Sequence, residues 1–343
     1  ADYVCFARII SMQEENGRYN YWYNPETAKY SSKHEDNFLR QAGTGYSLML
    51  AFEAIGDSAF LKSALKNLDY LLKYKQEIDA TKACFFYGQK AKLGGIALPM
   101  LTMLKYKEFS GDTIFDSDLK KLAETILLLQ SKYKTGKFKS TYVYKGDYDY
   151  EKTSGWESDI YPGEAMLALT FMHKHFKDER YLESLNKALA FYSKKGRWRK
   201  SAFIPWTASA FSKLYEIVPD EKYAAFVFKM CNNTLLQQNL NKKRITFGSF
   251  GSVPSVFTST SFEGIGDAVY LAQLTGNKNL EEKYIERSII AYQWLLQLQY
   301  TRNDSVPEEA VGGFKRSLHQ PEIRIDNTQH AISAMCRGLK YIY

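Results

Sequence analysis

Apolar and polar positions along the chain describe two kinds of helical segment. Residues 161–176, YPGEAMLALTFMHKHF, are almost wholly apolar through their middle, which predicts a helix buried on all sides. The next segment, RYLESLNKALAFYSKK, sets Leu182, Leu185 and Leu189 on one stripe and its charges elsewhere. That spacing is typical of an amphipathic helix with one face in water. A buried helix is thus followed by a one-sided helix.

The same couplet recurs along the chain. The other buried segments are RQAGTGYSLMLAF, KLGGIALPMLTML, PWTASAFSKLYEI and FEGIGDAVYLAQL, and each precedes an amphipathic stripe. Similar turns, such as IGDSAFL, FKDERYL and TGNKNLE, join the two helices of a pair. The repeat, roughly 45 to 70 residues long, is wider than that of common solenoids. The pattern predicts five helical hairpins and, from Asp326 to Leu339, the first helix of a sixth.

The sixth hairpin lacks a partner at the chain's end. The segment YVCFARIISM, Tyr3–Met12, is an unpaired helical candidate at the other end. We expect this N-terminal helix to pair with the C-terminal helix and close six hairpins into a ring. Tyr- and Gly-rich pieces between hairpins predict loops or short β-hairpins. No composition shift marks a boundary, so residues 1–343 are expected to form one all-α domain.

In a ring of parallel buried helices, the starts of these helices face one mouth. The sequence places acids, bases, amides and aromatics at those starts. The residues expected to be catalytic are Glu164, Glu263, Asp267, Asp326 and His330. The residues expected to bind substrate are Arg40, Gln41, Trp156, Asp159, Tyr161, Trp206, Arg324 and Gln329.

Helix capping is the structural alternative for some of these acids. Asp326 is followed three residues later by Gln329, and Thr260 is followed in the same way by Glu263. Both pairs match the capping box, in which the two side chains satisfy backbone N–H groups at a helix start. Acids in a first turn also meet the favourable end of the helix dipole.

For the other charged candidates, the alternative to a functional role is a structural role as a buried, paired side chain. Glu164 and Asp267 lie at or beyond the edge of the first turn in apolar helices, where an unpaired charge is costly. A buried ion pair is therefore the competing interpretation for both acids and for Arg40. His330 is either a general base or a core histidine.

Metal and cofactor signatures are missing from the sequence. The four cysteines lie far apart, without a C-x-x-C pair, and the histidines have no zinc-ligand spacing. No P-loop, G-x-G-x-x-G or G-x-S-x-G motif is present. We therefore expect neither a metal nor a cofactor.

Charge and composition narrow the range of binding partners that the chain could have. The net charge is +8, but the lysines are scattered opposite apolar stripes, which favours a solvated surface over a nucleic-acid site. The charge also suits an acidic polysaccharide, and aromatics at 15% suit either a core or a sugar-stacking cleft. The sequence contains no apolar run of roughly 18 residues, the length that would predict a membrane span. The first residue is Ala, so we expect an upstream segment, part of a larger polypeptide or a signal peptide, and favour a periplasmic or secreted location.

A resemblance to known proteins rests on the hairpin count, on the alternation of buried and amphipathic helices, and on three pieces of sequence. The pieces are LRQAGTGYSLMLAFEAIGDSAFL, YPGEAMLALTFMHKHFKDERYL and GGFKRSLHQPEIRIDNTQHAISAM. The chain resembles the six-hairpin (α/α)6 toroid superfamily over essentially its whole length. The resemblance implies a carbohydrate-processing role, as in glycosidases, uronate lyases and glucuronyl C5-epimerases, with the site in the mouth. Toroids that bind zinc through Cys and His, the prenyltransferase β chains and lanthionine cyclases, do not fit this sequence.

The leading hypothesis is an enzyme acting on a bacterial poly- or oligosaccharide. A glycoside hydrolase needs one protonated and one ionised carboxyl group. Glu164 could supply one, and Glu263 or Asp326 the other.

Two further hypotheses stay open. In a uronate lyase or C5-epimerase, Arg40 or Arg324 would hold the sugar carboxylate, and His330 or Tyr161 would move the neighbouring proton. In a non-catalytic toroid, the same mouth would bind a glycan or a protein. Alternatively, the whole toroid would be a purely structural domain.

Overall fold

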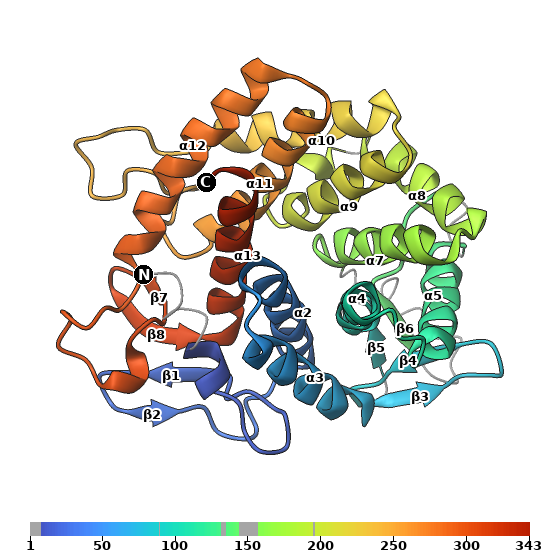
Figure 1. Cartoon of the computed structure of the whole chain (residues 1–343), viewed down its shortest axis with the longest axis horizontal. Coiled ribbons are helices and arrows are strands. Elements are labelled where there is room, and N and C mark those ends of the chain that lie inside the picture. The colour runs from blue at the N-terminus through green and yellow to red at the C-terminus, as the bar shows by residue number, and fades with distance from the viewer. Residues whose placement is uncertain (1–7, 89, 132–134, 144–156, 195) are drawn as a thin grey trace. The chain divides into compact units, whose positions relative to one another are not determined.

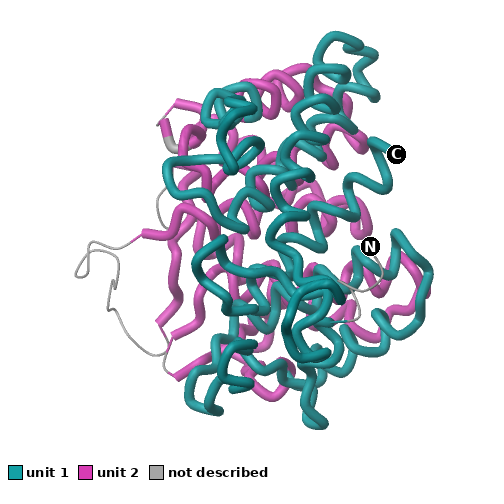
Figure 2. The backbone as a smooth tube through the Cα atoms, turned by 90° about the vertical axis from the view of Figure 1, so that its left-hand side faces the viewer, with its two compact units in different colours: residues 1–70, 231–343 teal, residues 71–230 magenta. Residues whose placement is uncertain are grey.

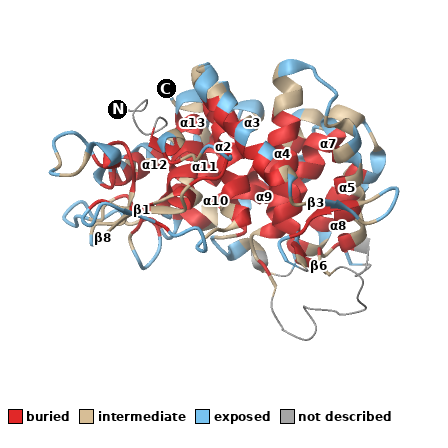
Figure 3. Ribbon diagram, turned by 90° about the horizontal axis from the view of Figure 1, so that it is seen from below, coloured by how far each residue is buried: buried red, intermediate tan, exposed pale blue. Residues whose placement is uncertain are grey.

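The helices follow the predicted alternation. The structure, a computed structural model, describes residues 8–88, 90–131, 135–143, 157–194 and 196–343. The buried helices are α2 (Phe38–Ile55), α4 (Leu93–Ser110), α7 (Tyr161–Phe176), α9 (Ile204–Ile217), α11 (Thr258–Leu274) and α13 (Ile325–Tyr341). The amphipathic helices are α3 (Ser58–Leu72), α5 (Asp116–Ser131), α8 (Glu179–Tyr192), α10 (Glu221–Leu235) and α12 (Lys278–Gln297). Each predicted hairpin is confirmed (Figure 1), and burial is concentrated on the first helix of each pair (Figure 3).

The chain divides into two compact units (Figure 2). Unit 1 joins both ends of the chain, residues 1–70 and 231–343, and unit 2 comprises residues 71–230. In unit 1, α13 packs against both α2 and α11, and α12 covers α11. In unit 2, α7 packs against both α4 and α9, while α5 and α8 cover α4 and α7. Among the described residues, no helix has the length and apolar character that a membrane crossing requires.

Short strands fill the connections, as the Tyr- and Gly-rich segments predict. In unit 1, β1 (Trp22–Asn24), β2 (Lys29–Tyr30), β7 (Lys315–Ser317) and β8 (Gln320–Arg324) form an antiparallel sheet in the order β2-β1-β8-β7. In unit 2, β3 (Lys75–Glu77) pairs with β4 (Ala83–Phe85), and β5 (Lys90–Lys92) pairs with β6 (Thr141–Val143). Two short 3-10 helices are η1 (Arg197–Arg199) and η2 (Glu308–Ala310).

The sheet of unit 1 joins segments from opposite ends of the chain. Trp22 in β1 faces Arg324 in β8, and the N–H of Ile325 donates to the carbonyl of Tyr21 at 3.0 Å. The start of α13 is therefore fixed against the segment that leads into α2. Of the predicted N-terminal helix, residues 8–11 are helical, and residues 3–7 lie outside the described part of the chain. Its pairing with α13 stays a prediction, as does a single domain.

A repeated contact, here named the glutamine–glycine clamp, links successive amphipathic helices. A glutamine at the end of one helix donates its side-chain amide to the carbonyl of a nearby glycine and to a carbonyl of the next amphipathic helix. The acceptors are Gly17 at 3.1 Å and Ser63 at 2.9 Å for Gln13, Gly136 at 3.1 Å and Ser184 at 2.9 Å for Gln130, and Gly248 at 3.4 Å and Arg287 at 2.9 Å for Gln238. One amide thus satisfies two otherwise separate carbonyls.

Only glycine fits the second position of the clamp. Gly17, Gly136 and Gly248 have φ values of 94°, 90° and 92°, a region that L-residues rarely adopt. A Cβ atom at any of them would overlap the backbone carbonyl oxygen of a residue in the next amphipathic helix, Lys66, Lys187 or Ile290. The glycines therefore permit both the turn and the close approach of the two segments.

Replacing Gly136 tests the clamp against a matched glycine. Gly111 also has a positive φ, 71°, but a Cβ there would meet nothing within 4 Å. We expect Gly111→Ala to lower the free energy of unfolding by about 1 kcal/mol, from backbone strain alone. Gly136→Ala should cost on the order of 3 kcal/mol or more, because overlap with the Lys187 carbonyl adds to the strain. Denaturant unfolding of both variants measures the difference, and equal losses would contradict the clamp.

Candidate functional site

Two arginines surround a buried carboxylate at the start of α13. Arg324 donates to both oxygens of Asp326, from Nε at 2.9 Å and from Nη2 at 2.6 Å. Nε of Arg40, on α2, lies 3.2 Å from Oδ2 of the same carboxylate, whose side chain is only 1% exposed. Burial alone would lower the pKa of Arg324, but hydrogen bonding and the charge of Asp326 raise it above the usual arginine value. Asp326 therefore lies between two arginine side chains.

The capping-box interpretation is wrong for both candidate pairs. Helix α13 begins at Ile325, its N-cap residue is Arg324, and no side chain caps it. Helix α11 begins at Thr258, so Thr260 lies inside the helix and its hydroxyl donates to the carbonyl of Phe257 at 2.8 Å. The acids of these pairs bind side chains from other positions instead.

His330 and Glu263 form a dyad between α13 and α11. Nδ1 of His330 lies 2.9 Å from Oε1 of Glu263. The glutamate side chain is 4% exposed and the histidine side chain 13% exposed. A carboxylate only accepts hydrogen bonds, so Nδ1 is the donor when it binds one, and Nε2 is the second nitrogen of the ring. The dyad gives His330 the partner that sequence reasoning lacked.

Asp267, the third predicted catalytic acid of unit 1, has an arginine partner that the sequence did not reveal. Oδ2 of Asp267 accepts a hydrogen bond from Nε of Arg337 at 2.9 Å, and both residues are buried. Burial would lower the pKa of Arg337, but the charges of Asp267 and Glu263 raise it. The buried-pair interpretation of Asp267 thus describes its surroundings. Arg40 pairs with the buried Asp326, but its own side chain is 34% exposed.

Gln41 and Gln329 bind groups within unit 1. The Gln41 amide accepts from the N–H of Tyr19 at 2.8 Å, and donates at 2.8 Å both to the carbonyl of Tyr19 and to Asp36. Oε1 of Gln329 accepts from the hydroxyl of Thr44 at 3.1 Å. These contacts join α2 to α13 and to the N-terminal segment. A role of the two amides in substrate binding stays a prediction.

Tyr21 belongs to this cluster, although sequence reasoning did not select it. Nη2 of Arg324 donates to the hydroxyl of Tyr21 at 2.6 Å, and the guanidinium lies 5.1 Å from the centre of that ring. The only signal in the sequence was the tyrosine-rich segment NGRYNYWYN, which does not distinguish one tyrosine from another. The β1–β8 pairing supplies the missing information, because it brings residues 21–24 beside Arg324.

Unit 2 holds the other predicted site residues at the starts of α7 and α9. Tyr161 is the first residue of α7, and Glu164 in its first turn is 4% exposed. Trp206 lies in the first turn of α9, close to Gly163, where a Cβ would overlap the tryptophan. Gly163 therefore lets the two helix starts approach closely.

Two predicted residues lie before α7. Asp159 accepts a hydrogen bond from Nζ of Lys200 at 2.7 Å, and both side chains are partly or largely exposed. Trp156 lies outside the described residues. A single cavity lined by the residues of both units stays a prediction.

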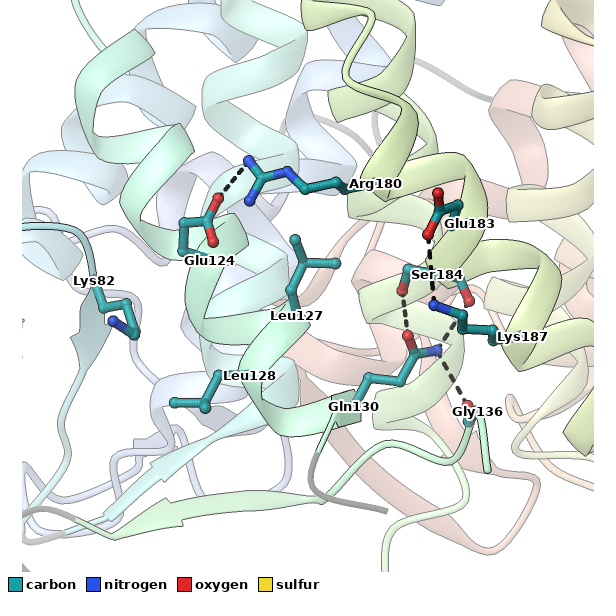
Figure 4. A pocket seen from close by; sticks show the side chains of 10 residues that line it. All are labelled: Lys82, Glu124, Leu127, Leu128, Gln130, Gly136, Arg180, Glu183, Ser184 and Lys187. Carbon is teal, nitrogen blue, oxygen red and sulfur yellow. Dashed lines mark hydrogen bonds and ion pairs between the residues drawn. The ribbon is translucent and has the colours of Figure 1, made fainter. Parts of the chain in front are cut away.

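A pocket of about 600 Å³ lies elsewhere in unit 2, on the amphipathic helices α5 and α8 (Figure 4). Most of its charged side chains pair with each other: Arg180 lies 2.6 Å from Glu124, and Lys187 lies 3.5 Å from Glu183. Lys82 pairs instead with Asp79, outside the lining. None of the predicted site residues lines this pocket. The described ranges also hold no group of three or more histidine, cysteine or carboxylate side chains that could bind a metal ion.

Comparisons with known proteins give structural matches alone. A scan against protein-family models finds no match, and a search of the curated proteins finds none. The chain is similar to the cellobiose 2-epimerase from Bacillus thermoamylovorans B4167, with 12% identity, a TM-score of 0.73 and coverage of 96% of this chain and 95% of that one. It is similar to an unsaturated glucuronyl hydrolase specific for heparin, with 11% identity, a TM-score of 0.69 and coverage of 98% and 95%.

A third similar structure is the GH76A α-1,6-mannanase from Salegentibacter sp. HEL1_6, with 11% identity, a TM-score of 0.65 and coverage of 97% of this chain and 96% of that one. Matches over nearly the full length of both chains establish a common fold. The chain has the all-α, (α/α)6 toroid fold that the sequence predicts, with short strands between its helical hairpins.

Proposed function

We propose that the chain is a carbohydrate-active enzyme whose reacting groups lie where α11 and α13 meet. Proteins of similar fold are named as an epimerase, an isomerase, a mannanase and a glucuronyl hydrolase, all of which act on sugars. Because one fold supports several chemistries, the reaction has to be argued from the side chains.

Proton transfer at a sugar carbon is the chemistry that the dyad supports best. The observation that carries it is the 2.9 Å contact between Nδ1 of His330 and Oε1 of Glu263. The carboxylate fixes the tautomer and orientation of the ring and stabilises the imidazolium that forms when Nε2 takes a proton. His330 is the catalytic base in this proposal, and Glu263 is its positioning residue.

The arginines beside the dyad suit the charge that such a step creates. Removing a proton next to a carbonyl or carboxylate places negative charge on oxygen, and a preorganised cation stabilises it. Arg40 extends from α2 with a side chain that is 34% exposed, whereas Arg324 is 19% exposed and bound to Asp326. We therefore propose Arg40 as the oxygen-binding group. Epimerisation, isomerisation and β-elimination all begin with this step.

Hydrolysis by paired carboxyl groups is the second candidate. It needs one protonated and one ionised carboxyl group. Asp326 and Asp267 bind arginines, and the other buried carboxyls of the described residues are Glu164 and Glu263. Glu164 lies in the first turn of α7, next in sequence to Gly163, which the Cβ atom of Trp206 closely approaches. Trp206 is buried, so this neighbourhood offers a sugar ring little aromatic surface on which to stack.

Isotope exchange separates the two reactions. We expect incubation in D2O with a panel of neutral reducing sugars and uronate-containing oligosaccharides to place deuterium on a sugar carbon, detected by mass spectrometry and NMR. His330→Gln should slow this exchange by about 100-fold or more, because the base is lost. His319→Gln, an exposed histidine in the β7–β8 turn, is the control and should leave the rate unchanged. Incorporation of 18O at a new reducing end from labelled water, without deuterium on carbon, would instead identify a hydrolase.

The role of Glu263 is tested by a change that keeps its shape. Glu263→Gln retains a hydrogen-bonding partner for His330 but removes the negative charge, so the imidazolium loses its stabilisation. We expect kcat to fall by about 100-fold or more while KM and the melting temperature change little. Full activity in this variant would contradict the dyad. A fall in melting temperature together with a loss of substrate binding would point to a purely structural pair.

A further inference from the structure

The connection that follows α10 exposes aliphatic side chains around a basic sequence. Residues 236–247, here named the basic loop, read LQQNLNKKRITF. Leu236 is 83% exposed, Leu240 41% and Ile245 69%. Lys242, Lys243 and Arg244 lie between the last two and are exposed as well. The loop runs towards α11 (Figure 1), and Val253, 75% exposed, follows it.

The basic loop has a fixed neck. The N–H of Asn239 donates to the carbonyl of Ser249 at 2.8 Å, and the N–H of Gly248 donates to the carbonyl of Asn239 at 2.8 Å. The side-chain amide of Asn239 crosses the loop to the hydroxyl of Thr246 at 2.7 Å. The clamp of Gln238 then binds this neck to α12. The aliphatic and basic side chains are thus presented on a preformed loop, which lowers the entropic cost of binding through them.

The charges of the basic loop are available to a partner. Within the described residues, Lys242, Lys243 and Arg244 make no ion pair. Two further cations flank the neck, since Lys283 donates to Asn232 at 2.7 Å and Arg287 to Gln238 at 3.4 Å. Positive charge and exposed aliphatic surface therefore occur together.

We propose that the basic loop is a docking surface for an anionic lipid membrane. Weak peripheral binding becomes stable when two signals combine, electrostatic attraction to anionic headgroups and insertion of apolar side chains into the interface. The three cations supply the first signal, and Leu236, Leu240 and Ile245 supply the second. A polysaccharide would be served by aromatic faces, but the exposed apolar side chains of this loop are aliphatic. This proposal is independent of the proposed reaction.

Vesicle sedimentation tests the membrane proposal with the full chain. We expect binding to large unilamellar vesicles of phosphatidylcholine mixed with phosphatidylglycerol, weaker binding at high salt, and little binding to phosphatidylcholine alone. The variant K242Q/K243Q/R244Q should bind on the order of 100-fold more weakly, because each basic side chain near the surface contributes about fivefold. No binding to the anionic vesicles would overturn the proposal.

Two further variants separate the loop from bulk charge. K29Q/K62Q/K66Q removes the same charge at exposed positions elsewhere in unit 1, and it should bind at least about tenfold more tightly than the loop variant. L236S/I245S keeps every charge and should still weaken binding. Equal binding by both triple variants would assign the effect to net charge and overturn the proposal. A dimer in light scattering that L236S/I245S dissociates would show that the loop binds protein, and would overturn it too.

Discussion

The glutamine–glycine clamp is the contact on which the arrangement of the helical hairpins depends. The buried helices are largely apolar, so packing alone specifies their rotation and their spacing from the next hairpin less closely than directional contacts do. The clamp adds a directional constraint, because one amide binds two carbonyls that belong to different segments. The glycine removes the only atom that would keep those segments apart. The contact recurs at Gln13, Gln130 and Gln238, so both units contain it.

With the hairpins fixed, burial decides what the charged residues can do. Helices α2, α11 and α13 carry more charge than apolar helices can hold unpaired. Arginines bind two of the acids, Asp326 and Asp267. Glu263 binds a histidine instead, the side chain that most often transfers protons in catalysis. The same need to compensate buried charge therefore leaves one pair suited to moving a proton.

Helical periodicity predicted the order and the boundaries of the hairpins well, because it is a local property of the sequence. Pairing between side chains was harder to predict. Asp267 and its partner Arg337 lie on different helices, and the arginine is hidden in an otherwise apolar segment. The clamp escaped notice because the distance from glutamine to glycine varies, from Gln13 and Gly17 to Gln238 and Gly248. Capping was predicted for Asp326 from a local motif, but the helix begins at Ile325, and Arg324 and Arg40 bind the carboxylate instead.

The packing of α2 on α13 has a consequence for how the protein is made. Helix α2 leaves the ribosome before α13, and the whole of unit 2 lies between them in the sequence. The face of α2 that α13 covers must therefore stay in water, or on a chaperone, until residues 325–341 have been made. Unit 1 completes its fold only then, whereas unit 2, continuous in sequence, can fold earlier.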